Sequence, residues 1–146
     1  MKKILVGIDF TEADQTLLDV VKPLAKAQGA SITLIHSTPP MAQWVGCYLA
    51  FVHEEIVERK EEAKVFQEKL DAMQATLVED GFTADTALIE AHPGPGIVKY
   101  ATEHGYEQIA VGTHSKNMIE RALLGSSADH VVRKSTAPVL VVPTMT

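Results

Sequence analysis

Short runs of apolar, β-branched residues alternate along the chain with longer segments in which apolar residues recur every three or four positions. The runs predict strands, and the three- and four-residue spacing predicts amphipathic helices. The predicted strands are residues 4–9, 31–36, 83–90, 108–112 and 139–142. Four of them are almost continuously apolar, which is typical of parallel strands covered on both faces. The third strand alternates polar and apolar residues, so we expect it at an edge of the sheet.

Four helical segments separate or follow these strands. The first begins at Thr11 and Asp14, a pair that resembles a capping box, and its apolar face ends at Gly29. We expect Pro23 to kink this helix, because proline lacks the backbone donor. The other helices are predicted at residues 52–80, 93–104 and 125–134.

Strands and helices in this order predict a single α/β domain over residues 1–146. The expected fold class is a doubly wound, Rossmann-like, five-stranded parallel sheet with four helices and strand order 3-2-1-4-5. Such sheets bind ligands outside the carboxyl ends of their strands, where the winding reverses. Residues 41–51 have no clear period, and we expect a loop over this ligand side with Trp44, Cys47 and Tyr48 as candidate contacts.

Composition narrows the class of protein. Of the 146 residues, 46% are apolar and 22% charged, as in an ordinary globular domain. The net charge of −6 argues against nucleic acid as the main partner. No apolar run is long enough for membrane insertion. The single cysteine, Cys47, excludes an internal disulfide and favours a reducing compartment, so the expected location is cytoplasmic.

Small residues follow the fourth predicted strand and open the fourth helix. Gly112 ends the strand and Ser115 follows it, and Gly125 and Ser126 begin the helix. Glycine lets the backbone approach a ligand, and the unpaired N–H groups of a helix start hold anions. Asp9, at the end of the first strand, meets these residues in one crevice if the two strands are neighbours. The pattern predicts a nucleotide pocket.

Over nearly its whole length the chain resembles the universal stress protein family. The resemblance rests on Lys3-Ile-Leu-Val-Gly-Ile-Asp-Phe-Thr, Leu34-Ile-His, Ile109-Ala-Val-Gly-Thr-His-Ser, and Leu124-Gly-Ser-Ser-Ala to Ala137-Pro-Val-Leu-Val-Val. The nucleotide-binding branch of that family carries glycine, two residues, glycine, nine residues, then glycine with serine or threonine. This chain matches at Gly112, Gly125 and Ser126 and has Ser115 in place of the second glycine.

The resemblance implies a site for ATP, or another adenine nucleotide, together with Mg²⁺. Asp9 would hold the adenine and ribose side and Ser37 would line the base, whereas the residues from Gly125 onward would hold phosphates. The implied ligand-binding residues are Gly7, Asp9, Ser37, Val111, Gly112, His114, Ser115, Gly125, Ser126 and Ser127. Two of these residues also have simpler interpretations, because Asp9 suits a helix cap and a loop histidine such as His114 is often only solvated.

The sequence lacks the common motifs of nucleotide-dependent and hydrolytic enzymes. It has no Gly-Lys-[Ser/Thr] P-loop, no dinucleotide fingerprint after Gly7 and no Gly-x-Ser-x-Gly elbow. The histidines lack metal-ligand spacing. A phosphorelay receiver would need an aspartate after the third strand, where this chain has Glu90-Ala-His-Pro-Gly. We therefore expect a stress-response regulator that acts by binding, with no catalytic residues and at most slow ATP hydrolysis. The alternative is a family member without nucleotide, acting as a dimeric protein-interaction module.

The last predicted strand is short and entirely apolar, and the expected strand order leaves it outermost. It consists of Val139, Leu140, Val141 and Val142. An unprotected edge invites pairing with another chain, and flanking prolines limit the length of such a ladder. We expect a homodimer in which this strand pairs with its own copy about a two-fold axis. An unknown regulatory protein is the other expected partner.

Overall fold

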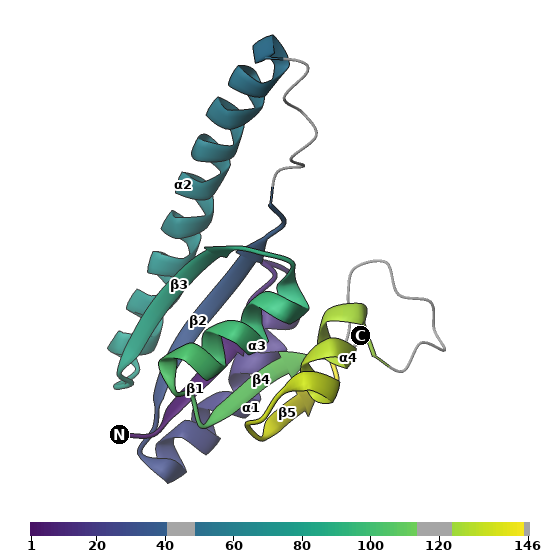
Figure 1. The fold of residues 1–146 in the computed structure, drawn as a ribbon. Helices are drawn as coiled ribbons and strands as arrows, with labels where there is room; N and C mark the ends of the chain where they lie inside the picture. Colours follow the sequence, from purple (N-terminus) through teal and green to yellow (C-terminus); the bar gives the residue numbers. More distant parts are fainter. Residues whose placement is uncertain (41–48, 114–123, 145–146) are drawn as a thin grey trace.

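The computed structural model describes residues 1–40, 49–113 and 124–144, with the backbone alone for residues 49–56. Strands and helices alternate along these ranges, as Figure 1 shows. The elements are β1 (Lys3–Gly7), α1 (Ala13–Gln28), β2 (Ser31–Thr38), α2 (Leu49–Glu79), β3 (Ala84–Glu90), α3 (Pro93–His104), β4 (Gln108–Gly112), α4 (Ser126–Lys134) and β5 (Val139–Val142).

The strands form one parallel sheet in the order β3-β2-β1-β4-β5. The chain therefore winds outward from β1 in one direction and from β4 in the other. Strands β1 and β4 are direct neighbours, with Leu5 opposite Ile109. This order confirms the predicted doubly wound fold, including the edge positions of β3 and β5. It also brings the carboxyl ends of β1 and β4 side by side.

Helices cover both faces of the sheet, which explains the almost continuous apolar runs in its central strands. On one face, the buried Leu5 of β1 packs in a cluster with Ile97 of α3. On the other face, Val6 packs with Leu17 of α1 and Leu70 of α2. Side chains of successive strand residues point to opposite faces, so β1 contributes to both clusters. The amino-terminal part of α2 projects beyond the sheet (Figure 1).

The predicted capping box at the start of α1 is wrong. The helix begins at Ala13, and its N-cap residue, Glu12, makes no capping bond through its side chain. The Asp14 carboxylate instead accepts hydrogen bonds from the backbone N–H groups of Asp9 and Phe10, at 3.1 and 2.8 Å. The Asp14 carboxylate therefore binds the turn before the helix and does not accept from the backbone N–H of Thr11, as a capping box would require. The helix continues through Pro23 and ends, as predicted, at a left-handed Gly29.

Other boundaries differ from the prediction by a few residues. Strand β1 ends at Gly7, two residues before Asp9, and α2 starts at Leu49, which places residues 49–51 in a helix and not in the predicted loop. Trp44, Cys47 and Tyr48 lie outside the described residues. Among the described helices, none has the length and apolar character needed to cross a membrane.

Candidate nucleotide site

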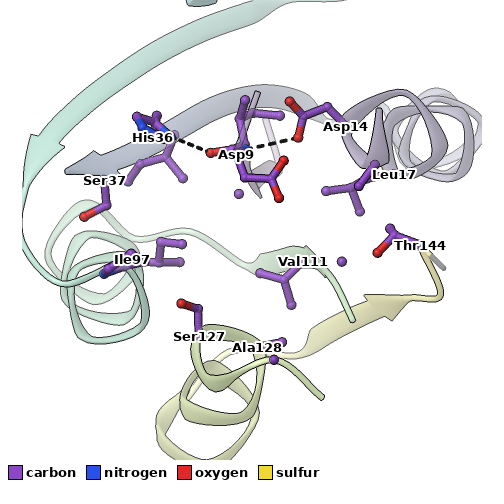
Figure 2. Close-up of a pocket in the computed structure, with 17 residues that line it drawn as sticks. Asp9, Asp14, Leu17, His36, Ser37, Ile97, Val111, Ser127, Ala128 and Thr144 are labelled. Atoms are coloured by element: carbon purple, nitrogen blue, oxygen red, sulfur yellow. Dashed lines mark hydrogen bonds between the residues drawn. The ribbon is translucent and has the colours of Figure 1, made fainter. Parts of the chain in front are cut away.

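A cavity of about 180 Å³ opens at the carboxyl ends of β1 and β4, where the winding of the sheet reverses. Its wall comes from segments far apart in the sequence, which Figure 2 shows converging on one space. The apolar part consists mainly of Leu17, Ile35, Ile97, Val111 and Ala128. An apolar wall with a few polar groups at its margin is typical of small-molecule sites.

The structure brings most of the predicted ligand-binding residues to this cavity. Those that line it are Gly7, Asp9, Ser37, Val111, Gly112, Gly125 and Ser127. Ser126 is the first residue of α4, is exposed and does not line the cavity. His114 and Ser115 lie outside the described residues. The lining residues that the sequence did not predict as ligand-binding include Asp14, His36 and Thr144.

A strained turn carries Asp9 into the cavity. The Asp9 carboxylate accepts hydrogen bonds from the backbone N–H of Thr11 at 3.1 Å and from its hydroxyl at 2.6 Å. Phe10 has φ of 60°, a conformation that costs a non-glycine residue about 1 kcal/mol or more. Its ring packs against His36 and Phe66, with centroids 4.5 and 5.2 Å apart. These ring contacts hold the turn in place.

Asp14 lies buried behind this turn, with 7% of its surface exposed. Burial raises the pKa of its carboxyl from 3.8 to about 7. The backbone N–H of Asp9 lowers the pKa, and the nearby Asp9 charge raises it again. Near neutral pH, Asp14 therefore gains or loses a proton, whereas the side chain of Asp9 lines the cavity itself. In the sequence, Asp14 fits an ordinary helix start, so no local signal distinguishes it.

His36 is the second lining residue that sequence analysis missed. Its Nδ1 lies 2.7 Å from the Ile8 carbonyl oxygen. A carbonyl only accepts, so Nδ1 carries the proton and donates it to this bond. The ring is also held edge-on to Phe66, with centroids 4.7 Å apart. The histidine thus ties the end of β2 to the turn after β1.

Thr113 connects the elements on the opposite side of the cavity. Its carbonyl oxygen accepts from the Gly125 N–H at 2.8 Å, and its own N–H donates to the Val142 carbonyl oxygen at 3.0 Å. The Thr113 hydroxyl accepts from the Thr144 N–H at 3.3 Å. These bonds fix the start of α4 and the end of β5 against the end of β4.

The start of α4 lines this side of the cavity through Gly125, Ser127 and Ala128. Gly125 is its N-cap residue, in an extended conformation with φ of −63°, and makes no side-chain capping bond. The first N–H groups of a helix lack partners within the helix and carry a positive partial charge. Together with the carboxylate of Asp9 on the facing side, these donors give the cavity two electrostatically different ends.

A doubly wound sheet with a mixed apolar and polar cavity at its switch point defines a class of small ligand-binding α/β domains. Within this class, the chain belongs to the universal stress protein family. The model of the Universal stress protein family matches residues 1–143, which confirms the resemblance noted in the sequence.

Individual relatives align with this chain over almost its full length. Universal stress protein MJ0577 of Methanocaldococcus jannaschii is 28% identical over 154 residues, covering 97% of this chain and 94% of the relative. YxiE of Bacillus subtilis is 29% identical and covers 96% and 97%. The solved structure of MJ0577 has a TM-score of 0.81 at 30% identity, covering 99% and 97%. A universal stress protein from Archaeoglobus fulgidus, solved in complex with dAMP, has a TM-score of 0.66 at 22% identity, covering 97% and 98%.

Proposed function

We propose that this protein is a cytoplasmic stress-response regulator that binds an adenine nucleotide, with ATP as the expected ligand. The observation that carries the proposal is the convergence of Asp9, Gly112 and the start of α4 on one cavity. Two structures with the same fold were solved with dAMP and with cAMP, which supports an adenine nucleotide as the ligand class. Binding, not turnover, is the proposed activity.

The cavity suggests an orientation for the ligand. The apolar wall suits the flat base, and the Ser37 hydroxyl, which donates to the Ala91 carbonyl at 2.6 Å, keeps an acceptor for an adenine amino group. The phosphates then run toward Gly125 and Ser127, where the helix start favours negative charge. Mg²⁺ would enter on the phosphates, since no group of three or more metal-ligating side chains occurs among the described residues.

The first prediction is that ATP with Mg²⁺ stabilises the folded protein. A ligand that binds only the folded state adds RT ln(1 + [L]/Kd), about 2.7 kcal/mol at a hundred times Kd. For a domain of this size the melting temperature then rises by about 8 °C. Calorimetry and thermal unfolding measure both effects. Inorganic triphosphate with Mg²⁺ is the control for stabilisation by the anion alone. Absence of heat and of any thermal shift at millimolar ATP would favour the nucleotide-free alternative.

We also propose a homodimer through β5, because among the described strands this edge strand has a neighbour on one side only. Val141 is half-buried in this strand and packs against the cluster beneath α3 and α4. We expect Val141→Lys to give a protein with the mass of one chain, because a charge at a strand pairing seam must be desolvated. Light scattering at micromolar concentration measures the mass.

The matched control for the dimer is Val132→Lys. Val132 lies on α4 and is 44% exposed, so its lysine variant keeps the dimer. Val142→Lys is unsuitable, because Val142 is 4% exposed in the core and a lysine there would unfold the domain. A monomeric wild type, or a Val141→Lys variant that remains dimeric, would contradict a seam at β5.

A further inference from the structure

Thr144 carries a buried hydroxyl without a hydrogen-bond partner. The residue is 4% exposed, and its Oγ1 has no partner among the described residues. Its backbone N–H donates to the Thr113 hydroxyl at 3.3 Å, whereas its own side-chain oxygen makes no such bond. Buried hydroxyls in native proteins are nearly always bonded, and an exception at a binding site calls for an explanation.

The residue that carries the unpartnered hydroxyl lines the proposed nucleotide cavity. Thr144 lines that cavity, and Figure 2 shows it on the far side from Ser37 with Asp9 between them. The side chain of Thr144 also explains why position 112 is a glycine. A Cβ added at Gly112 would lie 2.8 Å from Thr144 Cγ2 and 3.0 Å from its Oγ1. Because Gly112 does not have a positive φ, the close approach of Thr144 is the reason that glycine is needed there.

We infer that the Thr144 hydroxyl is a ligand-binding group that forms a hydrogen bond with an oxygen of the sugar–phosphate part of the nucleotide. The inference rests on the proposed function. The orientation argued above places the base near Ser37, so the far side of the cavity receives the ribose and the phosphates. A hydroxyl donates and accepts, so it matches a ribose hydroxyl or a phosphate oxygen. Ligand binding would then satisfy a polar atom that the ligand-free fold leaves unpaired.

The test uses Thr144→Val, which replaces the hydroxyl by a methyl group of similar size. We expect affinity for ATP to fall about tenfold, as is typical for one lost hydrogen bond. We expect the melting temperature of the ligand-free variant to rise by about 3 °C, because the unpaired polar atom is removed. Opposite signs for affinity and ligand-free stability are the signature of a hydroxyl kept for a ligand. Thr144→Ser retains the hydroxyl and should bind ATP within about twofold of wild type.

Thr33→Val is the matched control. Thr33 is 2% exposed, but its hydroxyl accepts a hydrogen bond from the Tyr106 hydroxyl at 2.9 Å, and it does not line the cavity. Removing it leaves Tyr106 without this acceptor, so the melting temperature should fall while ATP affinity stays at the wild-type value.

Calorimetry with adenosine, AMP and ATP separates the outcomes. If Thr144→Val already binds adenosine more weakly than wild type does, the bond is assigned to the ribose. If its affinity falls only for the ligands that carry phosphate, the bond is assigned to phosphate. Equal affinity of wild type and Thr144→Val for all three ligands would overturn the inference and leave the proposed function standing. So would an equal loss in Thr144→Ser and Thr144→Val. A wild type that binds none of the three ligands would overturn both.

Discussion

Replacing Gly125 by valine is expected to lower affinity for ATP by roughly a hundredfold, about 2.7 kcal/mol. Gly125 is buried in the cavity wall immediately before α4. A branched side chain there occupies space in front of the helix donors that we assign to the phosphates. Its φ of −63° and ψ of 158° are ordinary for any residue, so valine does not strain the backbone. Any loss of ligand-free stability should therefore come from packing of the added side chain, at about 1 to 3 kcal/mol.

The matched control for Gly125→Val is Gly29→Val. Gly29 has φ of 64° and no atom within 4 Å of an added Cβ, so its variant suffers backbone strain without steric contact. It should lose about 1 to 2 kcal/mol of stability and bind ATP like wild type. Calorimetry and urea unfolding measure both properties. If Gly125→Val retained wild-type affinity, phosphates would not approach the start of α4.

Asp14→Asn is expected to stabilise the protein at pH 8 and to flatten the pH dependence of its unfolding. Burial raises the pKa of Asp14 to about 7 in the folded protein, from an ordinary value of 3.8. Between these values the unfolded chain has lost the proton while the folded chain keeps it. The free energy of unfolding therefore falls as pH rises toward 7, by about 2 kcal/mol from pH 5. Asparagine does not ionise, so this loss disappears.

The two pH profiles should cross. Asparagine offers one acceptor oxygen to the N–H groups of Asp9 and Phe10, which now bond to the two oxygens of Asp14. The variant is therefore expected to be less stable than wild type at pH 5 and more stable at pH 8. Urea unfolding at intervals between these values measures the profiles. Asp85→Asn, at an exposed position of β3, should keep the wild-type shape. Parallel profiles for wild type and Asp14→Asn would show that the Asp14 carboxyl is ionised in the folded protein throughout this range.

Elements governed by local pattern were predictable from the sequence. The bounds of β4, α3 and β5 match, and Gly29 ends α1 as expected. Strands buried on both faces must be apolar along their whole length, and a left-handed helix end favours glycine. Asp14 shows where this reasoning fails. Its position suits a helix cap, but the positive φ of Phe10 turns the preceding backbone N–H groups toward it.

The sequence by itself determined the doubly wound fold and associated Asp9 with Gly112 and Gly125, because strand ends and glycine spacing are local features whose meeting point follows from strand order. Only the tertiary structure decided which side chains complete the site. Thr144 reaches Thr113 across 31 positions, and His36 reaches Ile8 across 28. The buried state of Asp14 and the unpaired hydroxyl of Thr144 depend on atoms supplied by such distant segments. Desolvation and hydrogen-bond satisfaction are properties of the packed environment, and no spacing along the chain encodes them directly.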